Sequence, residues 1–93
     1  MTVIFTSAAN ADLDEIFAYT TKNYPAQLLP LQFRIREIVA KIEALPQNAR
    51  QVEQRPGVRV VPLLRYPFHI FYRPTDDGIE ILHIRHVARN MWE

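Results

Sequence analysis

The chain has 93 residues, 48% of them hydrophobic, with 11 basic and 10 acidic side chains and a net charge of +1. This length predicts a single domain over residues 1–93 with one modest core, and the small net charge does not favour direct binding of DNA by this chain alone. Because cysteine is absent, a disulfide framework, a thiol nucleophile and a cysteine-type zinc site are excluded. The N-terminus is unlike a signal peptide, and no apolar run approaches the roughly 20 residues of a membrane helix, so we expect a cytoplasmic protein that makes no membrane contact.

The first predicted elements are a strand and an amphipathic helix. Residues 2–6 form a β-branched and aromatic run that is typical of a strand. Ser7 is the expected helix N-cap, and the helix should end before Pro25, since a residue that precedes proline avoids the α region. Acidic residues near the helix start suit the helix dipole; they are Asp12, Asp14 and Glu15. The apolar face should contain Leu13, Ile16, Phe17 and Thr20.

A second helix is predicted from Pro25 or Ala26 to about Leu45. Its apolar residues recur at spacings of three and four; they are Leu28, Leu31, Ile35, Ile38, Val39, Ile42 and Leu45. The short break between the helices predicts an antiparallel helical hairpin. Pro46 should end this helix, and the polar segment 47–57 reads as a loop.

Three strands are predicted in the C-terminal third of the chain, at about 58–65, 68–73 and 79–87, with a hairpin turn at 75–78. Pro62 lacks an N–H, so its strand should lie at an edge or contain a bulge. The order β-α-α-β-β-β predicts an α+β fold, in which the N-terminal strand and the helical hairpin pack on one face of a small antiparallel sheet.

Alternation along these strands assigns their side chains to two faces. The helices are expected to cover Val58, Val60, Leu64, Phe68, Ile70, Tyr72, Leu82 and Ile84. The other face should collect Arg59, Arg65, His69, Arg73, His83 and Arg85, with Phe71 and Ile81 among them. Such a face is either a solvated sheet surface or a binding surface of arginines around an apolar centre, and the pattern alone leaves both open.

Most known catalytic and ligand-binding motifs are absent from the sequence. The histidines have no nearby carboxylate pattern for a metal site, and two glycines are too few for a phosphate loop. One remaining constellation could cleave RNA without a metal, using a base, an acid and a cation beside the phosphate. Its candidates for base and acid are His69, His83 and His86, and its candidate cations are Arg59, Arg73 and Arg85.

Four segments occur in an order that resembles one protein family. They are ANADLDEIFAY at 9–19, GVR at 57–59, YPFHIFY at 66–72 and ILHIRH at 81–86, followed by Arg89. With the isoleucine-rich second helix ending in Leu45-Pro46, this set resembles the ParE branch of the ParE/RelE superfamily of bacterial toxins. The resemblance implies a ParE/RelE-like fold and a toxin of a type II toxin–antitoxin module that a ParD-like antitoxin neutralises.

Two activities occur in that superfamily. ParE-like members poison DNA gyrase, whereas RelE-like members cleave mRNA on the ribosome. RelE-like nucleases often supply lysines after their second helix, but this chain has no lysine after Lys41, and His69 stands where they have a catalytic arginine. We therefore expect an inhibitor that binds gyrase and is not an enzyme. A RelE-like, metal-independent endoribonuclease and a non-toxic interaction module of the same fold are the alternatives.

The resemblance also implies contact residues. Those for the target would be Arg59, Arg73, Arg85, His86, Arg89, Met91 and Trp92. The antitoxin would lay an amphipathic segment along the helical hairpin and form a hetero-oligomer with the toxin, and its contacts would include Leu13, Phe17, Leu28, Leu31 and Ile35. No metal or other cofactor is expected.

Overall fold

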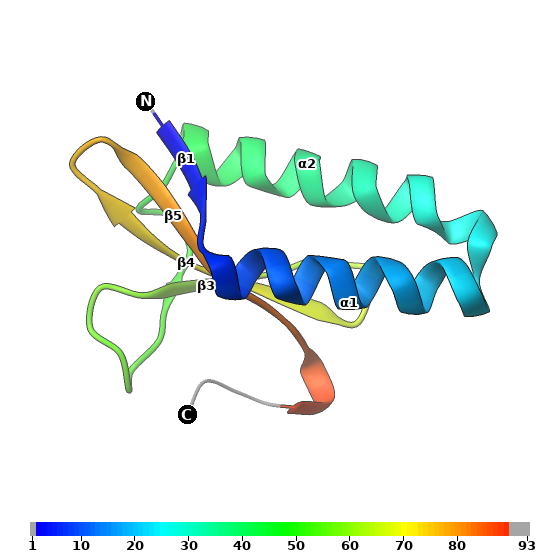
Figure 1. The fold of residues 1–93 in the computed structure, drawn as a ribbon. Helices are drawn as coiled ribbons and strands as arrows, with labels where there is room; N and C mark the ends of the chain where they lie inside the picture. The colour runs from blue at the N-terminus through cyan, green and yellow to red at the C-terminus, as the bar shows by residue number, and fades with distance from the viewer. Residues whose placement is uncertain (1, 90–93) are drawn as a thin grey trace.

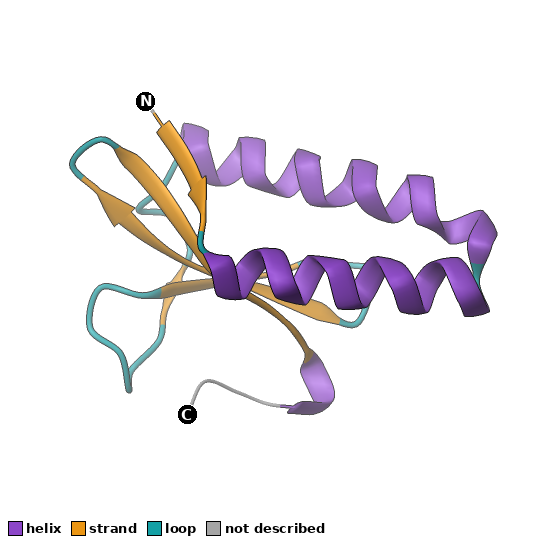
Figure 2. Ribbon diagram, in the orientation of Figure 1, coloured by secondary structure: helices purple, strands orange, loops and turns teal. Residues whose placement is uncertain are grey.

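The computed structural model describes residues 2–89, without the side chain of Arg89. Its strands are β1 (Thr2–Phe5), β2 (Arg50–Gln51), β3 (Arg59–Pro62), β4 (Phe68–Thr75) and β5 (Gly78–His86). Its α-helices are α1 (Ser7–Asn23) and α2 (Leu28–Ala44), and its 3₁₀ turns are η1 (Pro25–Gln27) and η2 (Val87–Arg89). Figure 2 shows how these elements alternate along the chain. No helix within the described range is long and apolar enough to cross a membrane.

The helix α1 begins one residue earlier than the sequence indicated. The N-cap is Thr6, whose extended backbone precedes the first helical residue, and its hydroxyl accepts a hydrogen bond from the backbone N–H of Ala9 at 3.1 Å. Ser7 is therefore the first residue of the helix and not its cap. At the other end, the backbone N–H of Tyr24 bonds to the carbonyl of Thr20 at 2.8 Å, and Pro25 prevents continuation.

The second helix starts slightly later than expected, because Pro25 opens a 3₁₀ turn before α2. Pro30 then lies in the first turn of α2, where its missing N–H would have no helical partner in any case. The helix ends at Ala44, where the N–H of Leu45 bonds to the carbonyl of Lys41 at 3.0 Å. The predicted helical hairpin is thus confirmed, and Figure 1 shows its two arms side by side, joined at the end far from β1.

The sheet is mixed and has five strands, in the order β1-β5-β4-β3-β2. β1 joins it as a parallel neighbour of β5, while the other pairs are antiparallel. The predicted α+β fold is confirmed, but the N-terminal strand belongs to the sheet and does not pack on its face. The helical hairpin alone covers one face (Figure 1).

A bulge between β4 and β5 decides which side chains face the helices. Phe71 lies opposite His83, but the next residue, Tyr72, lies opposite Ile81, so Leu82 has no partner in the ladder. One unpaired residue reverses the alternation along the rest of β5. Ile81 is therefore buried in the core beneath the helices, while Leu82 packs on the opposite face. Both of these face assignments were wrong in the sequence analysis.

The assignment of β3 also needs correction. Val58 and Val60 lie on the face away from the helices, whereas the buried Leu63 and the half-buried Val61 belong to the main core. The strand is shorter than predicted because φ becomes positive, 53° and 70°, at the two residues Leu64 and Arg65. Leu64 is consequently exposed, and Arg65 lies outside the sheet. The other expected core positions on β4 and β5 are confirmed; they are Phe68, Ile70, Tyr72 and Ile84.

Candidate functional site

Two polar side chains attach the first turns of α1 to the outer edge of β5. Along this edge β1 pairs with β5 only as far as Ile81. Beyond that residue no described strand lies on the outer side of β5, while β4 continues to pair on the inner side. The hydroxyl of Thr6 donates to the carbonyl of Leu82 at 3.1 Å, and Oδ2 of Asp12 accepts from the backbone N–H of Ile84 at 3.0 Å. The helix therefore satisfies edge groups that a longer β1 would have satisfied.

The same carboxylate orients a histidine on β5. Oδ2 of Asp12 lies 3.0 Å from Nδ1 of His83, and Nε2 of that ring lies 3.4 Å from Nη2 of Arg85. A guanidinium can only donate, so Nε2 accepts and the proton of the neutral ring resides on Nδ1, facing the carboxylate. Carboxylate, imidazole and guanidinium form one chain of hydrogen bonds, the Asp12–His83–Arg85 relay.

This relay ends on the open face, which is the sheet face that points away from the helices. Arg85 lies opposite His69 on β4, and His83 lies opposite Phe71. Two neighbouring strands thus bring both histidines and the arginine together. Burial, and then the positive charge of Arg50, lower the pKa of His69 from its ordinary value of 6.5, which favours the neutral imidazole.

A small apolar cluster occupies the centre of the open face. Val52, Val58, Val60 and Phe71 are buried there, with Leu82 packed against them. The chain between β2 and β3 curls over this side of the sheet, and the backbone N–H of Val52 bonds to the carbonyl of Val58 at 2.8 Å. An arginine and two histidines therefore border an apolar centre, a composition that protein interfaces favour.

Arg59, predicted on this face, lies on the other one. It is opposite Tyr72, beside the C-terminal end of α2. Its Nη1 donates to the carbonyl of Ala49 at 2.6 Å and its Nη2 donates to Oε1 of Gln47 at 2.8 Å. The prediction was wrong because β3 turns Val60 to the open face, which forces Arg59 to the helix side.

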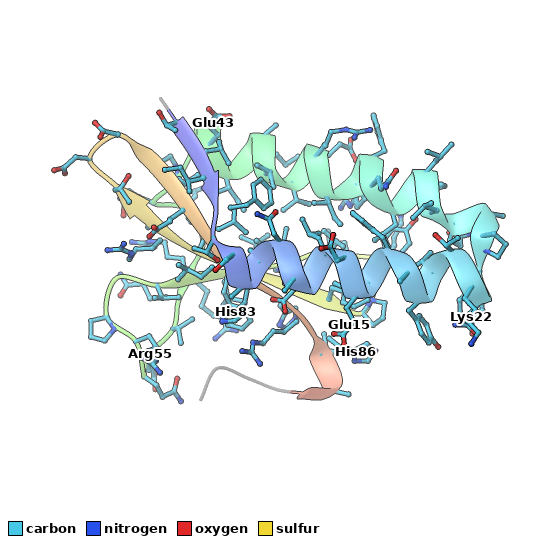
Figure 3. All side chains as sticks on the ribbon, viewed as in Figure 1. Glu15, Lys22, Glu43, Arg55, His83 and His86 are labelled. Carbon is cyan, nitrogen blue, oxygen red and sulfur yellow. The ribbon has the colours of Figure 1, made fainter. Side chains whose placement is uncertain are left out.

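Arg73 and His86 also have partners of their own. Arg73 lies on the open face but forms an ion pair with Glu80, its cross-strand neighbour. The rings of His86 and Phe68 meet edge-on, with their centroids 5.5 Å apart. The Nδ1 of His86 accepts a hydrogen bond from the backbone N–H of Ala88 at 3.0 Å. His86 borders a cavity of about 460 Å³ that also includes Glu15 of α1; Figure 3 shows these two side chains below α1.

The constellation considered for RNA cleavage is therefore only partly assembled. His69, His83 and Arg85 are neighbours on the open face, Arg59 is on the opposite face, and Arg73 is paired with an acid. Among residues 2–89, no group of three His, Asp or Glu side chains is placed to hold a metal ion. Met91 and Trp92 lie outside the described residues, as does the side chain of Arg89.

The expected antitoxin contacts on the hairpin differ in how much surface they offer. Leu31 and Ile35 are only 2% and 5% exposed, so they belong to the core, whereas Leu13, Phe17 and Leu28 are half-buried. The exposed apolar side chains of α2 are Leu29 and Phe33, at 73% and 59%. They share a helix face four residues apart.

Asp12 was missed as a site residue, because the sequence analysis attributed this acid to the helix dipole alone. A signal was nevertheless present. Asp12 comes three residues after the buried Ala9 and four before the buried Ile16, so it continues the inward face of α1. An ionisable side chain at such a position needs a partner, although nothing local names His83 as that partner.

Comparison with known proteins identifies a family, and several solved structures are similar to this chain. The sequence profile described as "ParE toxin of type II toxin-antitoxin system, parDE" matches residues 3–91. The solved structure described as the chromosomal ParDE TA system from P. aeruginosa contains a similar chain, with 32% sequence identity and a TM-score of 0.80. The similarity covers 92% of this chain and 95% of that one. No curated protein sequence matches.

Proposed function

Because this chain belongs to the ParE toxin family of type II toxin–antitoxin systems, we propose that it inhibits DNA gyrase by binding and that a ParD-like antitoxin neutralises it. In this proposal the protein is cytoplasmic and forms a hetero-oligomer with the antitoxin. Its open face contacts the target, and its helical hairpin contacts the antitoxin.

The observation that best supports a binding inhibitor is the fixed position of Arg85. The relay holds one of its nitrogens through His83 and Asp12, and the apolar cluster of the open face lies on the same side of the sheet. An arginine that is held in place beside an apolar centre loses less conformational entropy when a partner binds. Of the target contacts, Arg85 is therefore the first to test.

A RelE-like endoribonuclease is the second candidate, and one observation favours it. His83 has a carboxylate at Nδ1, and its Nε2 lies 3.4 Å from Nη2 of Arg85 on the open face. A histidine oriented in this way can act as a general base, and the arginine could stabilise charge on a phosphate. The occupied Arg59 and Arg73 leave fewer cations for an RNA backbone, so this reading is less favoured.

Two assays in parallel separate these candidates. The purified chain without antitoxin would be added to gyrase supercoiling of a plasmid and to ribosomes programmed with mRNA. We expect that supercoiling is inhibited and that the mRNA stays intact. At least about ten times more Arg85→Ala than wild-type protein should be needed for the same inhibition. Arg36→Ala, which removes an exposed arginine of α2, is the control and should inhibit like the wild type. Cleaved mRNA with normal gyrase activity would instead establish the nuclease and make His83 the first catalytic candidate.

A separate experiment tests whether the antitoxin contacts the helical hairpin. Leu29→Ser and Phe33→Ser remove the exposed apolar side chains of α2, and each should weaken binding of the ParD-like antitoxin while toxicity is retained. Leu64→Asn is the control, because Leu64, 56% exposed, is nearly as exposed as Phe33 but lies outside the hairpin with φ of 53°, where asparagine is well tolerated. Antitoxin binding that is unchanged in both serine variants would contradict the hairpin as the contact.

A further inference from the structure

A second cavity lies at the sheet edge opposite β1. It has a volume of about 690 Å³ and is a groove between the C-terminal half of α2 and the free part of β3. The groove exists because β2 pairs with only two residues of β3, Val60 and Arg59. The following residues, Val61 and Pro62, therefore have no strand on their outer side among the described strands.

The walls of this groove are hydrocarbon. Leu45 of the helical side faces Val61 and Pro62 of the strand side, and the core residues Ile38 and Ile42, 4% and 3% exposed, form the floor. Leu45 is 61% exposed, although it directly follows the last turn of α2. A concave apolar site with an exposed leucine at its border is a place where a partner can bury a side chain.

The rim of the groove is positively charged. Lys41 and Arg50 supply the charge, His69 lies beside them, and no Asp or Glu is among the described lining residues. Glu43 belongs to the same turn of α2 as Lys41 but does not line the groove. The closeness of Arg50 to His69 is also visible in the lowered pKa of that histidine, for which burial is the larger cause. Apolar walls below a cationic rim complement an acidic, amphipathic partner.

The shape of the edge indicates how such a partner would be held. Pro62 has no N–H, so an added strand would lack a backbone donor at this position. Docking must therefore rely on side chains and not on extension of the sheet. Tyr72, which also lines the groove, is fully buried and bonds to the carbonyl of Pro46, so its ring is not available to stack on a partner.

We propose that this groove binds a segment of the ParD-like antitoxin in which a large apolar side chain is flanked by carboxylates. The apolar side chain fills the space between α2 and β3, and the carboxylates reach Lys41 and Arg50 on the rim. This inference rests on the proposed neutralisation by an antitoxin. It adds a second contact to the outer face of the hairpin, at the C-terminal end of α2.

The test uses two lysines in equivalent helical positions. Lys41 lies in the last turn of α2 and Lys22 lies in the last turn of α1, so reversal to glutamate opposes the helix dipole equally in both. Figure 3 shows Lys22 at the far end of the hairpin from Glu43, the near neighbour of Lys41. Titration of purified antitoxin should give about tenfold weaker binding for Lys41→Glu at low salt, and little change for Lys22→Glu. The difference should shrink in about 1 M salt, where the Debye length is near 3 Å.

A second pair tests the apolar part. Ala44 lines the groove, and Ala11 on α1 does not; both are exposed. Ala44→Trp should obstruct the groove and weaken antitoxin binding, while Ala11→Trp should not. If the wild type binds antitoxin and both groove variants bind equally well, the groove proposal is wrong and neutralisation stands. If the antitoxin does not bind the wild type at all, neutralisation fails and the groove proposal fails with it.

Discussion

The carboxylate of Asp12 near the start of α1 lies 3.0 Å from Nδ1 of His83 on β5, although 71 positions separate the two residues. The same oxygen accepts the backbone N–H of Ile84. One side chain therefore performs two tasks: it completes the hydrogen bonding of the β5 edge and orients a ring on the open face. Through that ring it also positions Arg85, the first target contact to be tested.

Removal of this carboxylate should cost stability and order on the open face. Asp12→Ala leaves the N–H of Ile84 without its acceptor, and we expect a loss of about 1–3 kcal/mol in the free energy of unfolding by urea. Nitrogen NMR of His83 should show a proton on Nδ1 in the wild type and a mixture of tautomers in the variant. Asp14→Ala is the control on the same helix, where the side chain is exposed, and its effect should stay within about 0.5 kcal/mol. Equal losses in the two variants would contradict the role given to Asp12.

Gly78 should be indispensable for the attachment of β1. Its φ is 153°, and a Cβ built there would lie 1.9 Å from the carbonyl oxygen of Thr2. Backbone atoms on β1 must therefore move in Gly78→Ala, and we expect a loss of more than about 2 kcal/mol with faster amide exchange in β1.

The matched control for this change is Gly57→Ala. Gly57 also has a positive φ, 85°, but no atom lies within 4 Å of its Cβ position. Its substitution should lower the free energy of unfolding by only about 1–2 kcal/mol, the cost of placing a side chain at a positive φ. The cost of Gly78→Ala should exceed this value, and a smaller cost would mean that β1 does not approach Gly78 so closely.

The hydroxyl of Tyr72 should contribute to the connection after α2. It donates to the carbonyl of Pro46 at 2.7 Å, and the ring is fully buried. Tyr72→Phe keeps the ring but leaves that carbonyl without its donor, so thermal or urea unfolding should show a loss of about 0.5–1.5 kcal/mol. Tyr66→Phe is the control, since its hydroxyl makes only an exposed contact of 3.4 Å with Gln27. A loss in Tyr66→Phe as large as that in Tyr72→Phe would argue against a special role for the buried bond.

His69 should make stability depend on pH. Its pKa in the folded chain is lowered from 6.5 by burial and then by Arg50, so the unfolded chain binds the proton more readily. The contribution of His69 is complete above pH 6.5 and is lost as the pH falls from 6.5 towards the folded-state pKa.

Two measurements check this prediction. Unfolding by urea in steps below pH 6.5 should show a smaller loss of stability in His69→Gln than in the wild type. Proton NMR should show that Arg50→Ala raises the pKa of His69 only part of the way, because burial remains. A pKa of His69 at or above its ordinary value in the wild type would contradict both expectations.

The helices illustrate what could be predicted. Spacings of three and four mark both apolar faces, and Pro25 and Pro46 end each helix because proline cannot continue the backbone hydrogen bonds. These are local effects within about one turn of the chain. The N-cap was misplaced by one residue, since Thr6 and Ser7 both have hydroxyls that suit a cap, and the choice depends on the contact of Thr6 with Leu82.

The faces of the sheet illustrate what could not be predicted. Period-two alternation is reliable only while the register is unbroken, and the bulge at Leu82 interrupts it. Ile81 and Leu82 consequently exchanged sides relative to the prediction. Arg59 was misplaced for a related reason, because the face that β3 presents depends on its pairing with β4 and not on its own sequence.

The sequence by itself determined both helices, four of the five strands and the α+β class, because helix and strand periods and proline breaks act between near neighbours, and the order of its motifs determined the family resemblance. It missed β2 (Arg50–Gln51), which lies in the segment 47–57 that was predicted to be a loop. The tertiary structure alone decided that β1 lies parallel to β5, that a bulge turns Leu82 to the open face, and that Asp12 meets His83. The physical reason is that the energies behind these choices, such as burial of side chains, completion of edge hydrogen bonds and orientation of a ring by a carboxylate, arise only when distant segments pack together.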